Sequence, residues 1–335
     1  MSDQKQVVEA LLTPQAYPEN PGKIELIQTH ISFVFVTENF VYKMKKAVNF
    51  GFLDFSTLDK RRFFCEKELE LNRRLCPDVY LEVAPITKSN SIEIWGNGET
   101  VEYALKMKRL PQEKIMTVLL KEDKVDDKTI DRLAKIIASF HYSAQTNRQI
   151  NEYGSLKIIK TNWDENFAQT QKYIEQTIPK DQFQFIQNKI SSFMENNGAL
   201  FESRINAGKV RDCHGDMHSG NIFLTNDICI FDAIEFSDRF RYSDVASDVA
   251  FLAMDLDFQQ KPSLSDFFIK RYLAYSNDKE LLSVLPFYKC YRAYVRGKVI
   301  SFKLDDQNVA SEEKNAASKE AQAYFKIAAE YAKNL

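Results

Sequence analysis

The sequence lacks paired cysteines, a surplus of either charge and any long hydrophobic run. Its five cysteines are scattered without a Cys-x-x-Cys pair, which excludes a typical zinc site and predicts a reducing cytoplasm. The 45 basic and 47 acidic residues leave a net charge of -2, without the positive excess that a dedicated nucleic-acid binder needs. Carboxylates interrupt even the apolar segment "DVASDVAFLAMDLDF", and the first residues resemble neither a signal peptide nor an anchor. We therefore expect a cytoplasmic protein that binds neither nucleic acid nor membrane.

The sequence has ample material for a folded core. Hydrophobic residues make up 44% of the 335 positions and charged residues 27%, which is typical of a globular protein rather than a disordered one. A chain of this length exceeds the size at which one hydrophobic core stops growing. We therefore expect two packed lobes.

Strand patterns dominate the first half. A short helix is expected before Pro14, and the run 23–46 is rich in Val, Ile, Phe and Tyr, with "TEN" as the turn of an antiparallel hairpin. The segment "STLDKRRFFCEKELELNRRLCPD" predicts a helix that Ser56 or Thr57 caps and Pro77 stops. Three strands are expected in "LEVAPITK", "SIEIW" and "VEYALKMKRL".

Beyond Pro111 the pattern is mostly helical, with three helices expected after residue 242. One hairpin, "NIFLTNDICIFDAI", interrupts it, with "TND" as the turn. The change of pattern near "MKRLP" predicts a first lobe at residues 1–109 and a helical lobe at residues 110–335. This layout favours the α+β class, with a β-rich lobe around one main helix and a helical lobe that contains one hairpin.

A cluster of polar residues, "VRDCHGDMHSGNIFL", runs into that hairpin, and Asp232 follows in the apolar run "ICIFDAIEF". Such an acid is costly unless something uses it, and loops carry function more often than cores do. "HGDMHSGN" resembles the His-Gly-Asp-x-His-x-x-Asn loop of the aminoglycoside phosphotransferase and choline kinase families, which have a protein-kinase-like fold. "IFDAIEF" is similar to their metal-binding Asp segment, and "YSDVASDVAFL" to their Asp-x-x-x-Asp helix start.

The segment "YKMKKAVNFGFLDFSTLDKRR" is similar to an uncharacterised group of predicted bacterial kinases within these families. Some members of that group carry an additional P-loop kinase domain. This chain has no G-x-x-x-x-G-K-[ST], so that domain is not expected here.

The resemblance implies a kinase that uses ATP and Mg²⁺ to phosphorylate a hydroxyl of a small molecule. Asp216 occupies the position of the catalytic aspartate, which takes the proton of that hydroxyl. Asn221 and Asp232 supply the hard oxygen ligands that Mg²⁺ prefers. His214 is expected to brace the loop, and His218 to brace it or approach substrate, while Cys213 is expected to be buried.

The first lobe is expected to hold the nucleotide. Lys43 fits the phosphate-binding lysine, with Lys45 on the same face of the strand as the alternative. Glu68 fits the carboxylate partner on the following helix, with Glu66 as the alternative. Thr29 and Ser32 are expected to border the phosphates without the glycines of a G-x-G-x-x-G loop, and the backbone from Lys106 through Met107 to Arg109 is the expected hinge for adenine.

The acceptor is not specified by these motifs. The helix "FYKCYRAYVRGKVISFK" carries Lys289, Arg292, Arg296 and Lys298, which would suit a phosphate or carboxylate on the acceptor, or would form an ordinary solvated basic face. Asp244 and Asp248 are expected to cap a helix or hold the catalytic loop. Glu235 remains open between a part in the site and a structural part. A nucleotide-binding regulatory pseudokinase and a protein kinase are the alternative functions.

Overall fold

The structure is a computed structural model that describes residues 2–51, 53–307 and 309–335. The chain forms two compact units. Unit 1 consists of Met1–Ile115 and Asn221–Asp238, and unit 2 of Met116–Gly220 and Arg239–Leu335. The sequence placed one boundary between residues 109 and 110 and left the hairpin in the second part, whereas by contacts the hairpin belongs to unit 1.

Unit 1 is built on an antiparallel sheet. In the described residues its strands are ordered β1-β2-β3-β6-β4-β5. Their bounds are β1 Glu25–Gln28, β2 Ser32–Val36, β3 Phe40–Lys45, β4 Tyr80–Lys88, β5 Ile92–Ile94 and β6 Glu99–Lys108. The sequence predicted the turn that ends β2, but it combined β1 and β2 into one strand. The Thr29 hydroxyl accepts from the amide of Ser32 and closes a turn there, which splits the run in two.

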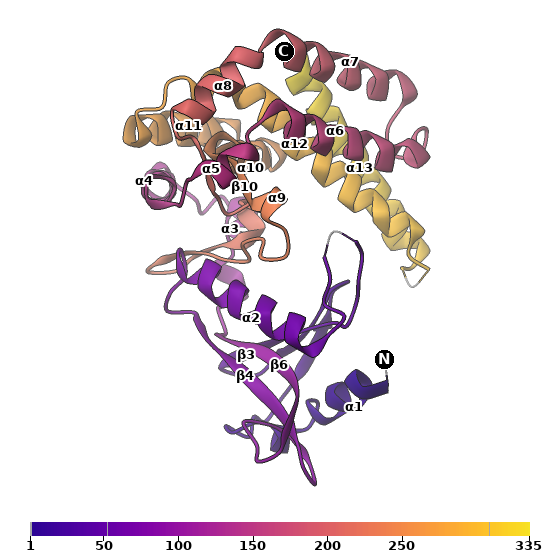
Figure 1. The fold of residues 1–335 in the computed structure, drawn as a ribbon. Helices are drawn as coiled ribbons and strands as arrows, with labels where there is room; N and C mark the ends of the chain where they lie inside the picture. Colours follow the sequence, from indigo (N-terminus) through magenta and orange to yellow (C-terminus); the bar gives the residue numbers. More distant parts are fainter. Residues whose placement is uncertain (1, 52, 308) are drawn as a thin grey trace. The chain divides into compact units, whose positions relative to one another are not determined.

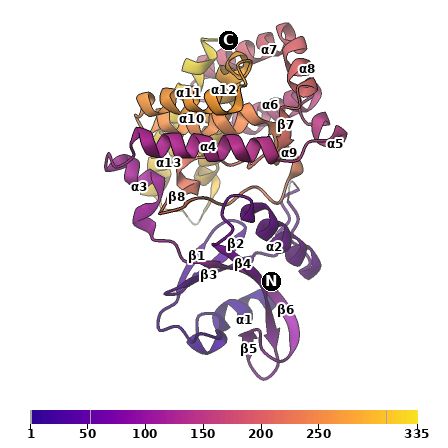
Figure 2. The ribbon, with the colours of Figure 1, turned by 90° about the vertical axis from the view of Figure 1, so that its left-hand side faces the viewer.

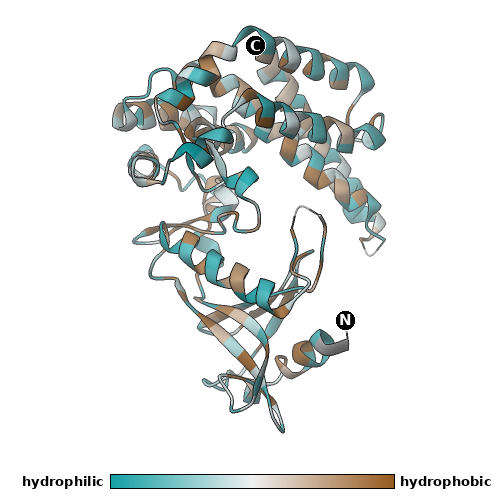
Figure 3. Ribbon diagram, in the orientation of Figure 1, coloured by the Kyte–Doolittle hydropathy of each residue, from teal (hydrophilic) through white to brown (hydrophobic). Residues whose placement is uncertain are grey.

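Two helices cover opposite faces of this sheet (Figures 1 and 2). On β3, Tyr42 and Met44 point to the face where Val7 of α1 (Ser2–Ala10) and Leu11, just after this helix, pack. Lys43 and Lys45 alternate with these two residues along β3 and point to the face of α2 (Leu58–Arg73). Hydrophobic and hydrophilic residues alternate along α2, and one side of this helix faces the sheet (Figure 3). The β3 lysines are therefore placed against a helix rather than in the apolar core.

The cap of α2 is Thr57, whose side chain accepts from the amide of Lys60, as expected from the sequence. Short 3-10 turns at η1 (Pro14–Ala16) and η2 (Gln112–Lys114) flank the sheet. The predicted hairpin forms from β8 (Ile222–Leu224) and β9 (Ile228–Ile230). Its side chains extend the second core of unit 1, where Phe223 and Cys229 pack with Tyr80 and Leu105.

The hairpin is bonded to the end of α2 by a disulfide between Cys76 and Cys229. These two cysteines are 153 residues apart in the chain, so the sequence pattern did not indicate that they pair. The fold nevertheless places their Cα atoms 4.8 Å from one another, within the range of a disulfide. The three other cysteines, Cys65, Cys213 and Cys290, are free thiols and buried.

We expect reduction of this bond to destabilise unit 1. A cross-link that closes so long a loop stabilises the fold by about 2–4 kcal/mol, mainly by restricting the unfolded chain. Thiol titration of the denatured protein, purified without reductant, should find three thiols before reduction and five after it. Chemical denaturation should then show the lower free energy of unfolding in the reduced protein. Five thiols before reduction would contradict the bond.

Unit 2 is mostly helical. Its core places α10 against both α11 and α12, and α12 in turn against α13, while α4 packs on α11 (Figure 2). Because α10 is surrounded in this way, all but its last two residues are buried. The helices are α3 Met116–Lys121, α4 Asp127–Ser143, α5 Arg148–Glu152, α6 Leu156–Thr170, α7 Lys180–Asn196, α8 Gly198–Asn206, α9 Asp238–Arg241, α10 Val245–Phe258, α11 Pro262–Ser276, α12 Leu281–Ser301 and α13 Ser311–Ala332, with 3-10 turns η3 Gln171–Tyr173, η4 Ser219–Asn221 and η5 Phe302–Asp305.

Two details of the sequence prediction for this half were wrong. Four helices rather than three follow residue 242 in the described part of the chain, α10 to α13. A pair of short strands, β7 (Val210–Asp212) and β10 (Tyr242–Asp244), was also missed, because strands of this length carry no visible alternation. The α+β class is confirmed. Among the described helices, none has the length and apolar character needed to cross a membrane.

Candidate active site

The two β3 lysines and the helix carboxylate meet in one buried cluster of unit 1. Lys43 Nζ lies 2.8 Å from Glu68 Oε1 and 2.7 Å from Asp232 Oδ1. Lys45 Nζ lies 2.7 Å from Glu68 Oε2 and also contacts Glu235. Glu68 therefore divides its two oxygens between the lysines.

The charges of this cluster stabilise one another. Burial alone would lower the pKa of the Lys43 ammonium, but the charges of Asp232 and Glu68 outweigh burial and hold this pKa well above its ordinary value. Burial would raise the pKa of Glu68, but Lys43 and Lys45 hold it well below the usual range. Both lysines and Glu68 are therefore charged at neutral pH.

The two lysines differ in access to solvent. The Lys43 side chain is 16% exposed and its partner Asp232 is 43% exposed, whereas Lys45 is 1% exposed. Lys43 is thus the lysine of the pair that a ligand can reach. The alternative helix carboxylate, Glu66, is exposed and pairs with Arg62 on its own helix, so it does not contact either lysine.

Asp232 is held in an unusual backbone conformation. Its φ of 64° lies in the left-handed region, which costs free energy for a residue other than glycine, and strain of this kind clusters at functional sites. Two side chains fix the backbone there: the amide of Asp232 donates to the hydroxyl of Tyr80 at 3.2 Å, and the amide of Ala233 donates to Asn72 Oδ1 at 2.9 Å. Asn72 also donates to the carbonyl of Glu68 at 2.8 Å. Asn72 therefore links the backbone of Glu68 to the backbone that follows Asp232.

The hairpin brings the two predicted metal ligands to the same place. Ile222 pairs with Ile230, and the amide of Phe231 donates to the carbonyl of Asn221 at 3.0 Å, so Asn221 and Asp232 stand at neighbouring ends of β8 and β9. An amide oxygen and a carboxylate are hard donors of the kind that Mg²⁺ binds. The donor set of this structure therefore fits Mg²⁺, which Asn221 and Asp232 would hold.

The two segments predicted to contact the nucleotide, residues 29–32 and the hinge 106–109, contain groups that already bond within unit 1. The Thr29 hydroxyl accepts from the amides of Ile31 and Ser32 within its turn, and the Ser32 side chain is buried. In the expected hinge, Met107 lies between Val41 and Tyr80 inside the sheet. The amide of Arg109 donates to the carbonyl of Asn39 and that of Lys108 to Val79. These two amides are not available to adenine while the sheet is intact, because β6 continues to Lys108.

In unit 2 the predicted catalytic loop, residues 214–220, is braced by both of its histidines. The amide of Asp216 donates to His214 Nδ1 at 3.3 Å, and the amide of Gly220 donates to His218 Nδ1 at 3.1 Å. This leaves Nε2 of His218 to carry the proton, and it lies 3.4 Å from Asp216 Oδ2. Gly215, with a φ of 87°, supplies the left-handed turn that the loop needs just before Asp216.

Asp216 is charged and accessible. Its side chain is 34% exposed. Burial opposes the charged form, but His218 and Arg296 stabilise it more strongly, so the pKa of Asp216 lies below its ordinary value. The carboxylate is able to accept a hydrogen bond from a hydroxyl at any physiological pH.

Asp248 holds the backbone of this loop, as one of the two roles expected for it. Its carboxylate accepts from the amides of His214 at 2.8 Å and Gly215 at 3.0 Å. Arg292 donates to the carbonyl of Gly215 at 2.8 Å and to the Ser247 hydroxyl at 3.0 Å. Side chains of α10 and α12 therefore hold the backbone of the loop. Asp244 has the other expected role: it caps α10 through the amide of Ala246.

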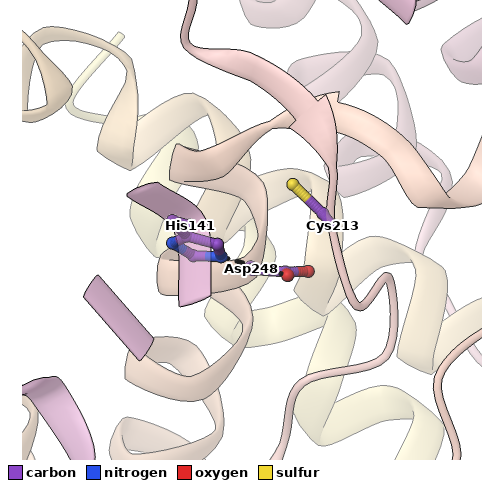
Figure 4. Close-up of side chains that lie close together, drawn as sticks. All are labelled: His141, Cys213 and Asp248. Atoms are coloured by element: carbon purple, nitrogen blue, oxygen red, sulfur yellow. Dashed lines mark hydrogen bonds and ion pairs between the residues drawn. The ribbon is translucent and has the colours of Figure 1, made fainter. Parts of the chain in front are cut away.

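His141, Cys213 and Asp248 form a buried group whose donor atoms lie within 4.8 Å of one another (Figure 4). The group could in principle hold a metal, but its atoms already have other uses. His141 bonds Tyr272 through Nδ1 and Asp248 through Nε2, and both oxygens of Asp248 accept from the loop. Burial raises the pKa of the Cys213 thiol well above its ordinary value, and the thiol lies 3.4 Å from the carbonyl oxygen of Ser243. We interpret the group as a support of the catalytic loop.

The basic helix α12 is mostly paired within the protein. Lys289 bonds Asp257 at 2.7 Å, and Arg292, being buried and bonded to the loop, does not present a solvated or acceptor-facing charge. Lys298 bonds Asn166 at 2.7 Å and Gln169 at 2.8 Å. Neither alternative from the sequence, an anion-binding face or a solvated basic face, holds for Lys289 and Arg292. Arg296 is the member whose charge stabilises Asp216.

Lys298 provides a pH-dependent contribution to stability. Burial lowers its pKa to about 8 against the charge of Glu165, from 10.5 for an ordinary lysine. Between these two values the unfolded chain binds the proton more strongly, so stability should rise as pH rises from about 8 to about 10.5. The free energy of unfolding of the wild type minus that of Lys298→Met should increase over this interval in denaturation experiments. A difference that stays flat would contradict the shifted pKa.

Several residues of the site were not found from the sequence. Asn72 and Tyr80, which hold Asp232, and His141, which holds Asp248, carried no motif. Asn72 offered one signal, since it is a polar residue one turn beyond Glu68 on the same face of α2. The other two depend on contacts between segments far apart in the chain.

Comparisons with known proteins agree with this geometry. A model of the phosphotransferase enzyme family matches residues 65–284. An uncharacterised protein of Mycobacterium tuberculosis is 32% identical over 277 residues, which cover 82% of this chain and 54% of that protein, and one of Mycobacterium bovis matches equally. The chain thus spans about half the length of these curated relatives.

A solved choline/ethanolamine kinase family protein from Mesorhizobium loti superposes with a TM-score of 0.53 at 11% identity, over 98% of this chain and all of that one. At this identity the likeness shows the fold, and it confirms the protein-kinase-like fold expected from the sequence. The matched residues 65–284 are more than half of the chain and include Glu68, Asp216 and Asp232, so the chain belongs to the phosphotransferase enzyme family.

Proposed function

We propose that the chain is an ATP- and Mg²⁺-dependent phosphotransferase that transfers the γ-phosphate of ATP to a hydroxyl of a small molecule. The observation that carries this proposal is the position of Lys43, an accessible ammonium held between Glu68 and Asp232. A lysine fixed in this way is a binding group for phosphate, and the adjacent Asp232 and Asn221 fit Mg²⁺.

In this mechanism Lys43 binds the phosphates of the nucleotide and Glu68 keeps its ammonium in place. Asn221 and Asp232 would hold Mg²⁺, which neutralises charge on the transferred phosphoryl group. Asp216 accepts a hydrogen bond from the acceptor hydroxyl and orients its oxygen. Because the pKa of Asp216 is low, its main part is to position the hydroxyl, and it takes the proton late in the transfer.

The acceptor of this chain is inferred from charge. Arg296 is the basic side chain of α12 that acts on Asp216, and it would suit an acceptor with a phosphate or carboxylate near the reacting hydroxyl. A polycationic acceptor has no such support from α12.

The test is a screen of small-molecule alcohols with ATP and Mg²⁺, read by ADP formation and by mass spectrometry of the product. The panel should contain anionic, neutral and cationic acceptors in equal number. Transfer to one acceptor class supports the proposal and names the class. Binding of ATP without transfer to any small molecule would favour a regulatory pseudokinase, and transfer to protein side chains alone would favour a protein kinase.

A further inference from the structure

The cluster behind Lys43 contains a second lysine that no nucleotide can reach. Lys45 Nζ lies between Glu68 Oε2 and Glu235, and the ring of Phe55 lies 4.8 Å away. Lys45 is 1% exposed and Glu235 is 5% exposed. Lys45 is therefore not an alternative phosphate ligand, and its charge acts only on protein groups.

The segment after β9 is bound to β3 at two points. Lys43 and Lys45, two residues apart on one face of the strand, contact Asp232 and Glu235, three residues apart on the segment. The outer contact, Lys43 with Asp232, is partly exposed, while the inner contact is buried. The inner pair thus fixes the segment and leaves the outer pair next to solvent.

The charges in this cluster are unequal. Two lysines face the three carboxylates of Glu68, Asp232 and Glu235, which leaves an excess of one negative charge. Without Lys45, one ammonium would face all three carboxylates. A phosphate would then approach a more negative site, and the carboxylates would compete with it for Lys43.

We propose that Lys45 is a positioning residue for nucleotide binding, which neutralises Glu235 and half of Glu68 so that the ammonium of Lys43 stays available to phosphate. This proposal rests on the proposed function. Glu235 is then the structural counter-charge of Lys45 and not a metal ligand.

The test is a cycle of variants in which Mg²⁺ with ADP, or with a non-hydrolysable ATP analogue, is titrated by calorimetry. Lys45→Met should weaken binding at least tenfold, because it leaves two negative charges in excess. Glu235→Gln leaves no negative charge in excess, so it should bind at least as tightly as the wild type. Lys45→Met/Glu235→Gln restores the wild-type excess of one negative charge, so its affinity should return to within threefold of the wild type. Thermal melting is measured in parallel, since a buried pair can be replaced by neutral groups without loss of the fold.

A purely structural part for Lys45 predicts a different pattern. The double variant would then bind as weakly as Lys45→Met or more weakly, and that result would overturn the proposal. If Lys45→Met does not fold, Lys45→Gln takes its place in the cycle. Lys43→Met is the control that should lose binding in every background. A wild type that binds no nucleotide would defeat the proposed function and this inference together, whereas a wild type that binds without the expected rescue would defeat this inference alone.

Discussion

Asp216→Asn is expected to lower kcat for phosphate transfer by about 10²–10⁴-fold, which is the usual contribution of a positioned acid or base. The amide keeps the shape of the side chain but loses the charge that would orient the acceptor hydroxyl. Asp216 is 34% exposed and its pKa is lowered, so the wild-type carboxylate is ready for this role without prior loss of a proton. The affinity for nucleotide should stay within threefold, because the nucleotide ligands proposed above belong to unit 1.

The rate is measured with the acceptor found in the screen, and the affinity by calorimetry. Asp164→Asn serves as the matched control, since Asp164 is an exposed aspartate of α6 that pairs with Lys160. The control should keep the wild-type rate. Equal rates for Asp216→Asn and the wild type would show that the acceptor hydroxyl is oriented elsewhere, whatever the nucleotide affinity.

The pH dependence of kcat supplies a second readout of the same residue. Because the pKa of Asp216 lies below its ordinary value, its carboxylate stays charged throughout the neutral range. The acid limb of the profile should therefore not contain an ionisation of Asp216 above pH about 4, the ordinary value for aspartate. A limb near neutrality that disappears in Asp216→Asn would contradict the low pKa.

The parts of the site that could be predicted from the sequence are those with local order. The loop from His214 to Asn221 has its spacing within one short segment, and the TND turn of the following hairpin is enough to bring Asn221 and Asp232 together. Likewise, two lysines two residues apart on a strand must share a face. These features follow from the periodicity of the backbone, so the sequence alone was enough to predict them.

The identity of partners could not be predicted in the same way. Lys45 and Glu235 are 190 residues apart, and nothing near either residue in the sequence reveals the other. Arg292 gave the opposite error: at helical spacing it resembles a solvated cation, but α12 turns it toward Gly215 and the core. Whether a charged side chain faces solvent, a ligand or another charge is decided by packing between elements, which the pattern along one element does not contain.

The same limit explains the nucleotide contacts. Thr29 and Ser32 were chosen for their hydroxyls, yet a hydroxyl next to a turn often bonds its own backbone first, and Thr29 does so. The expected hinge was placed within β6, because the end of a strand is difficult to locate from sequence. The amides of Lys108 and Arg109 already donate to neighbouring backbone carbonyls, so we expect the adenine contact after Arg109.

Asp232→Asn is expected to lower the affinity for the metal by about 100-fold or more in the presence of nucleotide, because a neutral amide replaces the charged ligand that a hard cation prefers. The fold should survive, since Asp232 is 43% exposed and Tyr80 and Asn72 bind its backbone segment rather than its side chain. Lys43 keeps Glu68 as a partner in this variant.

The measurement is Mn²⁺ binding by electron paramagnetic resonance with ADP present, which is independent of turnover. Glu66→Gln, which removes an exposed carboxylate of α2, is the control and should bind Mn²⁺ as the wild type does. Undiminished Mn²⁺ affinity in Asp232→Asn would place the metal on other ligands and would remove Asp232 from the proposed mechanism.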